Sequence, residues 1–292
     1  MIISAAIVDE TPTVQFRRMT TGDIDAGLRL CRISGWDQVA RDWERFLAPP
    51  SDAVVAVRDG RVLGTCATIR YGEAFAWIGM VLVDPDAQGQ GLGAALLVRA
   101  IDMRHDVPAI RLDATPAGHP LYLKQNFMEE TRLRRMERMT AAPAETSGDP
   151  RVRQMTATDL PGVKAMDEEV FGAPRAELLE WMFRGAPEYA AVAIEDGRLA
   201  GYLLARQGFE FDHLGPIVAR DLATATALTM PCLARRGRPI VIDAACDHAR
   251  WLAVLEANGF REQRPFIRMY RGAGAPFGDS RYQFAVTGPE FG

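Results

Sequence analysis

Three glycines, Gly89, Gly91 and Gly93, are the residues whose type and spacing point most directly to chemistry. They lie between a short apolar run, residues 78–83, and a segment from Leu92 onward in which apolar residues recur at helical spacing. Because glycine has no Cβ atom, successive backbone N–H groups in such a turn can converge on an anion at the positive end of the helix dipole. The pattern predicts a strand, a phosphate-binding turn and a helix, with a pyrophosphate as the ligand.

The same residues match two kinds of nucleotide-binding turn. Gly89-x-Gly91-x-x-Ala94 fits the fingerprint of dinucleotide-binding proteins, and Asp113 lies about twenty residues further on, where a ribose-binding carboxylate is expected. In that fold the strand runs directly into the first glycine, whereas here Pro85 interrupts the segment. Gln88-x-x-Gly91-x-Gly93 after Val-Asp-Pro instead resembles the acyl-CoA loop of the GNAT superfamily of N-acetyltransferases. We favour this second interpretation.

The elements around the loop are expected in the order typical of that superfamily. Downstream, an alternating strand over residues 110–114 and a turn precede a short helix that contains Tyr122. Asn126-Phe127 stands where members commonly have Gly-Phe, and Asn is the next most tolerant residue of a left-handed helix cap. Upstream, Asp59-Gly60 predicts a tight hairpin turn between two strands. Residues 14–140 thus match the GNAT order of helix, hairpin, strand, loop, helix, strand, helix and strand.

Length, charge and composition limit the classes of protein that are possible. The 292 residues can form two cores of ordinary size. With 34 basic and 38 acidic residues the net charge is −4, so no basic face is expected for nucleic acid or an anionic membrane. No apolar run reaches the roughly eighteen residues of a membrane span, and no signal peptide is recognisable, so the cytoplasm is the expected location. The Cys and His residues show neither CxxC nor HExxH spacing, so we expect no metal site.

The second part of the chain repeats the first. Residues 141–150 are small, polar and proline-containing, and they predict an interdomain linker. Five stretches then recur in order: 18–24 as 154–160, 56–64 as 193–201, 112–114 as 242–244, 126–127 as 259–260, and 135–136 as 268–269. We therefore predict an α/β protein with mixed (α+β) sheets and two tandem copies of one fold. Residues 14–140 are the expected catalytic domain, and residues 151–292 are the second copy with a C-terminal tail.

The second copy lacks the glycine loop and the tyrosine that predict a site in the first copy. Its segment 213–225 has no glycine after the strand to let the backbone approach a pyrophosphate, and Leu255 stands at the position equivalent to Tyr122. We expect a degenerate domain that forms a wall of the acceptor pocket or that imitates the partner of a GNAT dimer. Trp251, Phe266 and residues 282–284 are its candidate contributions to the acceptor pocket or to the domain interface. This layout resembles the tandem (YitH-like) acetyltransferases of the superfamily.

The resemblance implies roles for the site residues. Acyl transfer to an amine requires a polarised acetyl carbonyl, a deprotonated ammonium group and a protonated leaving thiolate. By resemblance, acetyl-CoA is the co-substrate, and the strand before the loop splays from its neighbour to bind the pantetheine arm. Tyr122 would protonate the sulfur, with a plain core aromatic as the alternative. The expected cofactor-binding residues are Val81, Leu82, Val83, Gln88, Gly89, Gln90, Gly91, Leu92, Gly93 and Ala94.

No motif marks the general base or the acceptor site. Family members often place a glutamate on the strand that here spans residues 75–80, but the nearest carboxylate is Glu73, just before it. Alternatively, Glu73 is only a surface glutamate in a hairpin, and a water relayed by backbone carbonyls deprotonates the amine instead. GNAT folds build part of the acceptor site after the first helix, which implies contacts from four residues: Trp36, Asp37, Gln38 and Asp42. The alternative is that Trp36 and Trp43, seven residues apart, pack on one helix face.

Three functions of different classes are compatible with these features. The first, which we favour, is an N-acetyltransferase that moves an acetyl group to the primary amine of a small molecule by direct attack. The second is a protein N-acetyltransferase, which would need an open groove that a second domain over the site disfavours. The third is a non-catalytic acyl-CoA sensor or scaffold, suggested by the degenerate copy and the missing base. Either a monomer or a homodimer is expected, because an internal duplication can replace a dimer or lie within one.

Overall fold

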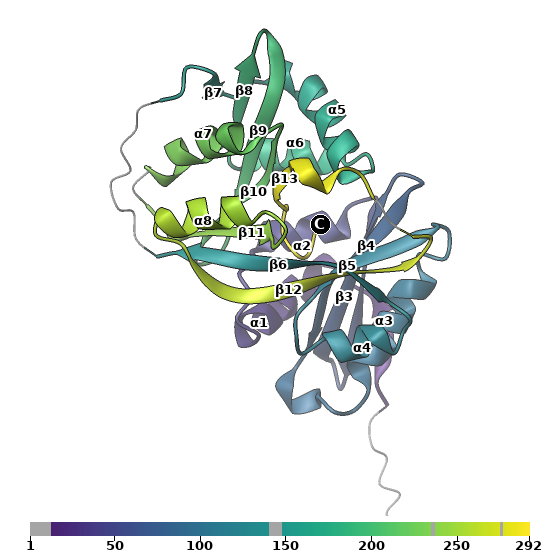
Figure 1. The fold of residues 1–292 in the computed structure, drawn as a ribbon. Coiled ribbons are helices and arrows are strands. Elements are labelled where there is room, and N and C mark those ends of the chain that lie inside the picture. Colours follow the sequence, from purple (N-terminus) through teal and green to yellow (C-terminus); the bar gives the residue numbers. More distant parts are fainter. Residues whose placement is uncertain (1–12, 140–147, 235–236, 275–276) are drawn as a thin grey trace, which may run out of the picture.

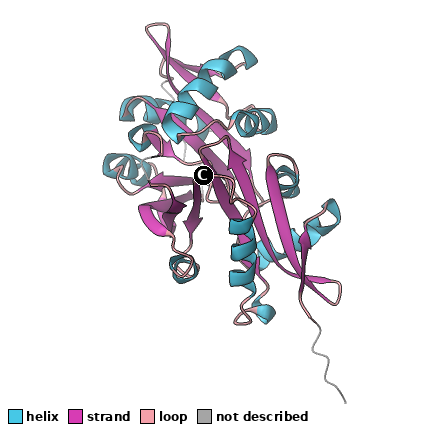
Figure 2. Ribbon diagram, turned by 90° about the vertical axis from the view of Figure 1, so that its right-hand side faces the viewer, coloured by secondary structure: helices cyan, strands magenta, loops and turns pink. Residues whose placement is uncertain are grey.

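The computed structural model describes residues 13–139, 148–234, 237–274 and 277–292, so residues 141–147 of the predicted linker lie outside the described residues. One mixed sheet runs through both halves of the molecule, with helices on its two faces (Figures 1 and 2). The predicted fold class, an α/β protein with two copies of one fold, is confirmed.

The elements of the first half are β1 (Gln15–Arg18), α1 (Ile24–Ile33), α2 (Ala40–Leu47), β2 (Ser51–Arg58), β3 (Arg61–Tyr71), β4 (Phe75–Val83), α3 (Leu92–Asp102), β5 (Ala109–Ala114), α4 (His119–Leu123) and β6 (Met128–Arg138). Those of the second half are β7 (Val152–Gln154), α5 (Leu160–Phe171), α6 (Ala176–Gly185), β8 (Ala191–Glu195), β9 (Arg198–Gln207), β10 (Asp212–Ala219), α7 (Leu222–Leu233), β11 (Ile240–Ala245), α8 (Ala249–Ala257), β12 (Arg261–Gly272) and β13 (Gln283–Ala285).

The repeated sequence stretches form the same local structures in both halves. Asp59-Gly60 and Asp196-Gly197 both have positive φ angles, as the predicted hairpin turns require. The carboxylates of Asp23 and Asp159 each accept the N–H of the threonine three residues earlier, at 2.8 and 2.7 Å. These capping interactions satisfy a backbone donor where the first helix of each half begins.

Each half has two apolar cores, one on each face of the sheet. In the first half α1 and α2 cover one face through Leu30, Trp43 and Phe46, and α3 covers the other face through Leu96 and Leu97. In the second half α5 and α6 cover one face, and α7 and α8 cover the other. Among the described residues, none of the helices has the length and apolar character that crossing a bilayer requires.

The two halves exchange their long last strands. The strand order is β1-β2-β3-β4-β5-β12-β6-β11-β10-β9-β8-β7, so β12 of the second half lies between β5 and β6 of the first. In turn β6 pairs with β11 of the second half, from Arg138↔Ile240 to Leu133↔Ala245. Figure 1 shows these two long strands, teal β6 and yellow β12, crossing the middle of the molecule. The sheet around each half is therefore completed by a strand of the other half.

The C-terminal tail, residues 283–292, is buried between the halves. Its β13 pairs with β10 of the second half, and the residues after β13 then contact the first half. Phe291 stacks on Phe46 with ring centroids 4.9 Å apart, and the Tyr71 hydroxyl donates to the Phe291 carbonyl at 2.6 Å. The tail thus joins the two halves through packing and hydrogen bonds.

Candidate active site

Strand β4 diverges from β5 at the point where the glycine loop approaches. The two strands pair in parallel only at Ala76↔Ile110 and Trp77↔Arg111. Further along, β4 is irregular: its register with β3 shifts near Met80, which has a φ of 56°, and the Thr65 hydroxyl donates to the Met80 carbonyl at 2.8 Å. A bulge of this kind bends a strand. The backbone of residues 81–83 consequently has no β5 partner, as the resemblance implied.

The glycine loop presents unpaired backbone donors. Gly89 and Gly91 have φ angles of 75° and 78°, in the left-handed region that favours glycine, and Gly91 caps the N-terminus of α3. Among the described residues, the N–H groups of residues 89–94 donate to no acceptor. Such donors at the start of a helix favour an anion, which the macrodipole also stabilises. The loop therefore has the unpaired donors that a pyrophosphate would require.

A cavity of about 530 Å³, which we call the loop cavity, extends from the glycine loop to Tyr122. This volume lies in the usual range for small-molecule sites. Its walls include every predicted cofactor-binding residue except Gln90, whose side chain accepts a hydrogen bond from Arg58 at 3.1 Å instead. Ser34 and Trp36 form part of the wall as well.

Tyr122 lies where the loop cavity adjoins a smaller, deeper one. Its ring packs edge-on against Phe127 with centroids 5.9 Å apart, and Asn126 has the left-handed φ of 61° expected of a helix cap. Its hydroxyl makes no hydrogen bond with the described residues. Burial raises the pKa of the Tyr122 phenol, so the hydroxyl stays protonated at neutral pH. A proton donor is thus available at this junction.

Tyr122 also lines the first of two further cavities, and the second shares Trp36, Arg135 and Arg264 with the first. The inner chamber, about 30 Å³, is lined by Trp36, Gln38, Ile78, Gly79, Met80, Val81, Asp113, Thr115, Tyr122, Arg135, Arg264, Phe266, Pro289 and Glu290. The outer chamber, about 80 Å³, is lined by Arg32, Gly35, Trp36, Asp37, Arg135, Phe209, Glu210, Phe211, Gln263 and Arg264. Both halves contribute to each chamber: β12 reaches both, the tail reaches the inner one, and residues 209–211 reach the outer one.

The predicted acceptor residues occupy different parts of this arrangement. Trp36 lines all three cavities, Gln38 lines the inner chamber and Asp37 lines the outer one. The Asp37 carboxylate accepts the N–H of Glu210 at 2.6 Å, which ties the loop after α1 to the second half. Asp42 lines none of these three cavities. It is 1% exposed and accepts the Val39 N–H at the start of α2.

Glu73, the candidate general base, is not brought to the chambers. It lies in the turn between β3 and β4, its side chain is 89% exposed, and it pairs with Arg70 at 2.7 Å. Trp251 is also absent from the chambers: it is fully buried in the core of the second half, where it packs against Phe284. Of the apolar side chains expected from the second half, Phe266 reaches the inner chamber.

Glu290 and Arg264 are among the chamber residues that the sequence pattern did not predict. Glu290 reaches the inner chamber because the tail passes directly over β4: a Cβ atom on Gly79 would lie 2.7 Å from the Glu290 carbonyl oxygen. A glycine inside an apolar strand indicates such a close backbone approach, so Gly79 was the available signal. Nothing in the sequence pattern distinguished Arg264 from the other arginines.

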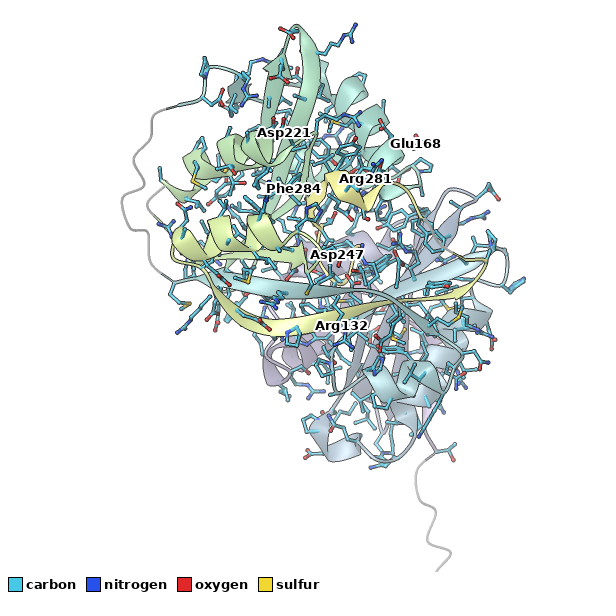
Figure 3. The ribbon with its side chains drawn as sticks, viewed as in Figure 1. Arg132, Glu168, Asp221, Asp247, Arg281 and Phe284 are labelled. Atoms are coloured by element: carbon cyan, nitrogen blue, oxygen red, sulfur yellow. The ribbon has the colours of Figure 1, made fainter. Side chains whose placement is uncertain are left out.

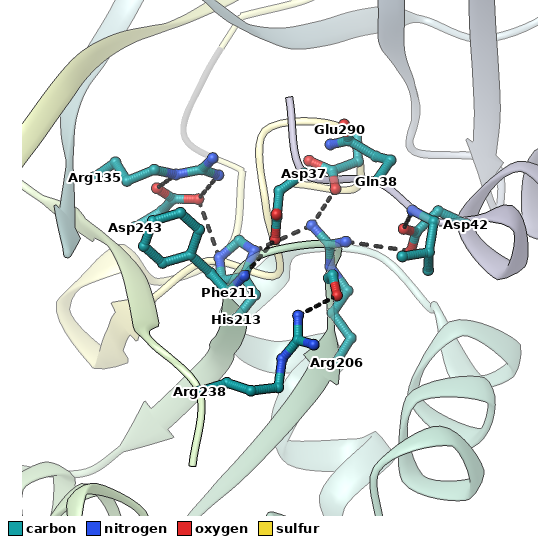
Figure 4. Close-up of polar contacts among 12 residues, drawn as sticks. Asp37, Gln38, Asp42, Arg135, Arg206, Phe211, His213, Arg238, Asp243 and Glu290 are labelled. Carbon is teal, nitrogen blue, oxygen red and sulfur yellow. Dashed lines mark hydrogen bonds and ion pairs between the residues drawn. The ribbon is translucent and has the colours of Figure 1, made fainter. Parts of the chain in front are cut away.

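Two residues that line the inner chamber, Arg135 and Glu290, belong to a buried network of charges (Figure 4). Arg206 contacts Asp42 at 3.2 Å, Glu290, and the His213 ring at 3.1 Å. Burial raises the pKa of Asp42 to about 6, although Arg206 opposes the change. For Glu290 burial also acts to raise the pKa, but Arg206 and His213 outweigh it, so the pKa lies below its usual value. Asp243 pairs with Arg135 in the same network.

In the second half, described residues fill the gap between strands that corresponds to the β4–β5 gap of the first half. There β10 diverges from β11 after His213↔Val241, but β13 fills the gap by pairing with β10 at Ile217↔Ala285. The N-terminus of α7 is capped by Asp221, whose carboxylate accepts the Thr224 N–H at 2.7 Å (Figure 3). A strand of the protein thus occupies the gap, and a carboxylate stands where a phosphate would have to bind. The second copy is degenerate, as predicted.

Comparison with known proteins places both halves in one family. Models of an acetyltransferase (GNAT) domain match residues 49–129 and residues 163–285. The chain is 27% identical over 254 residues to the uncharacterized N-acetyltransferase YitH of Bacillus subtilis, covering 84% of this chain and 87% of that protein. It is also 27% identical over 261 residues to a holothin acyltransferase of a Pseudoalteromonas species, covering 88% and 87%. A putative acetyltransferase from Pyrococcus horikoshii has the same fold, with a TM-score of 0.79, 22% identity and 96% of each chain covered.

Proposed function

Since the chain belongs to the GNAT family of acetyltransferases, with one GNAT domain in each half, we propose that it transfers an acetyl group from acetyl-CoA to the primary amine of a small molecule. The observation that supports this most is the continuity of the site. Unpaired N–H groups at residues 89–94, the loop cavity, the free Tyr122 hydroxyl and the inner chamber follow one another.

Acetyl-CoA would bind along the loop cavity. Its pyrophosphate would accept hydrogen bonds from the loop between Gln88 and Ala94 at the N-terminus of α3. Its pantetheine arm would pair with the backbone of residues 81–83, which β5 leaves unpaired. This arrangement would bring the thioester to the bulge at Met80, beside Tyr122.

The reaction needs two proton transfers. The acceptor ammonium loses a proton to water, because Glu290 has a lowered pKa and is engaged by Arg206, and Glu73 is remote. The amine nitrogen then bonds to the acetyl carbon, and the bond from that carbon to sulfur breaks. Tyr122 donates its phenolic proton to the departing thiolate, and the second amine proton, passed through solvent, restores the phenol. The products are an acetamide, CoA thiol and one proton released to water.

The chambers favour a small acceptor over a peptide. The inner chamber holds about 30 Å³ and is covered by the tail, while Asp37 holds the loop at residues 209–211 over the outer chamber. A peptide strand would need a continuous open groove. A non-catalytic acyl-CoA sensor would have no use for an unpaired, protonated tyrosine hydroxyl at the junction of two cavities.

The test is CoA release from acetyl-CoA in the presence of a library of small primary amines and lysine-containing peptides. We expect turnover with a subset of the small amines and none with the peptides. Calorimetric binding of acetyl-CoA without turnover across the library would favour the sensor. Turnover with peptides alone would favour a protein acetyltransferase.

A further inference from the structure

We propose that the acceptor amine also bears a carboxylate, and that Arg264 binds this carboxylate at the junction of the inner and outer chambers. The substrate class is then a small amino acid or a related amino carboxylic acid. This inference rests on the proposed function, because it concerns the acceptor of the same site.

Arg264 is a cation with no anionic partner among the described residues; its guanidinium lies over the Phe266 ring, 5.5 Å from the centroid. It lines both chambers, and it forms no hydrogen bond or ion pair with the described residues. Its Nε atom is shielded from solvent and has no acceptor. A buried polar group of this kind is costly unless something completes its hydrogen bonds, so a ligand that does so would bind favourably.

In the sheet, Arg264 and Arg135 are neighbours, and Asp243, the carboxylate next to them in register, balances only one of the two positive charges. On β12 it lies directly opposite Arg135 of β6, and Arg135 in turn lies opposite Asp243 of β11. Like charges on facing residues of neighbouring strands are destabilising. A register shift between Glu262 and Arg264 marks a bulge at Gln263, a feature that redirects side chains and is often found beside active sites.

The carboxylates near Arg264 are already engaged. Asp243 forms two hydrogen bonds with Arg135, at 2.8 and 2.7 Å. Glu290 pairs with Arg206, and Asp37 accepts the N–H groups of Glu210 and Phe211. Burial and the neighbouring Arg135 lower the pKa of Arg264 to about 10, which still leaves the guanidinium charged at neutral pH. The anion that completes this charge balance must therefore come from the ligand.

The charge and space favour a carboxylate over a phosphate. One unpaired guanidinium matches the two oxygens and single charge of a carboxylate. A phosphate dianion would need a second free cation. Arg135 is committed to Asp243, and both terminal nitrogens of Arg32 donate to backbone carbonyls. Because Tyr122 and Arg264 line the same chamber of about 30 Å³, the amine and the carboxylate must be close together in one small molecule.

The experiment compares amino acids with their matched carboxamides, in which the anion is removed and the amine is retained. For the parent enzyme we expect kcat/KM for the best amino acid to exceed that for its amide. Arg264→Gln should lower kcat/KM for the amino acid by roughly 10- to 100-fold, the range for a charge-assisted hydrogen bond, and leave the amide unchanged. Arg264→Lys should restore part of the loss, and the Kd for acetyl-CoA should stay constant in all variants.

Arg134→Gln is the matched control. Arg134 lies on the same strand as Arg135, is 42% exposed, pairs with Glu262 at 3.5 Å and lines neither chamber, so its replacement should not change the preference for the acid. Equal losses for acid and amide in Arg264→Gln would overturn the inference. So would a parent enzyme that acetylates uncharged or phosphorylated amines in preference to amino acids, an outcome that leaves the proposed function intact.

Absence of turnover with every amine would instead contradict the proposed function. Calorimetry with N-acetyl amino acids and their amides would then test Arg264 by itself. Tighter binding of the acid that Arg264→Gln abolishes would support the carboxylate site, and equal binding of acid and amide would refute it.

Discussion

Arg135 and Asp243 form a buried, two-pronged ion pair between strands that come from different halves of the chain. Nε and Nη2 of Arg135 on β6 donate to the two carboxylate oxygens of Asp243 on β11, at 2.8 and 2.7 Å. The sequence repeat creates the same pair again: Arg268 on β12 donates to Asp113 on β5 at 2.8 and 2.9 Å. In both pairs the residues are directly opposite in register. Each exchanged strand is thus fixed by one buried arginine.

Removing one partner of such a pair should destabilise the protein strongly. Asp243→Ala would leave the buried Arg135 charge uncompensated, and we expect the free energy of unfolding to fall by about 3–5 kcal/mol. Denaturant titration measures this loss. The exposed pair between Glu169 and Arg220 is the control, since Glu169→Ala should cost no more than about 1 kcal/mol. Similar losses in the two variants would contradict a structural role for the buried pair.

Gly91→Val should weaken acetyl-CoA binding by at least about 10-fold. A β-branched residue is strained at the φ of 78°, and its side chain would stand over the unpaired N–H groups that we propose bind the pyrophosphate. Isothermal titration calorimetry gives the affinity. Gly197→Val introduces the same strain at a φ of 74° in the hairpin of the second half, and it should leave the affinity unchanged. An unaltered Kd in a folded Gly91→Val variant would reject the pyrophosphate assignment.

Tyr122→Phe should lower kcat by roughly 10²- to 10⁴-fold, the usual contribution of a general acid. The ring and its packing against Phe127 are retained, so the affinity for acetyl-CoA and the melting temperature should change little. Steady-state kinetics and a thermal melt separate the two effects. If kcat remained within about threefold of the parent value, Tyr122 would be a packing residue only.

One acetyl-CoA should bind per chain. Residues 89–94 offer unpaired N–H groups in the first half, whereas in the second half β13 fills the gap beside β10 and Asp221 caps α7. Calorimetric titration should therefore give a single site, which Gly91→Val weakens. Two equivalent sites per chain would show that a helix start capped by a carboxylate still accepts the pyrophosphate.

Because of Asp42, the free energy of unfolding should fall as the pH rises from about 4 to 6. Burial raises its folded-state pKa to about 6, above the usual unfolded value near 3.9, so the folded state binds an extra proton in this window. The groups around it are Arg206, Arg41 and Glu290. The contribution is fully present below about pH 4 and is lost as the pH rises through 6. The asparagine in the variant Asp42→Asn does not titrate. As the pH rises from about 4 to 6, the free energy of unfolding of Asp42→Asn should therefore increase relative to that of the parent by on the order of 1–3 kcal/mol. A difference independent of pH would contradict the raised pKa.

Several features of the site were predictable because they depend on neighbouring residues alone. The turn at Asp59-Gly60, the left-handed glycines of the loop and the cap at Asn126 follow from the backbone preferences of those residue types. The internal repeat likewise predicted two copies of one fold, and the missing glycines predicted that the second copy is degenerate. Every predicted cofactor-binding residue except Gln90 lines the loop cavity.

Contacts between residues far apart in the chain determine which side chains line the inner and outer chambers. Which strand lies beside β5 depends on long-range pairing, and no local pattern showed that β12 would enter there and bring Arg264 with it. Glu290 reaches the inner chamber only because the tail crosses β4. Glu73 is much closer to β4 in the sequence, yet its side chain is exposed to solvent. By itself the sequence determined the conformation of the glycine loop, since that loop is made of consecutive residues. Only the tertiary structure decided which charges stay unpaired, because pairing is a property of side chains brought together from both halves.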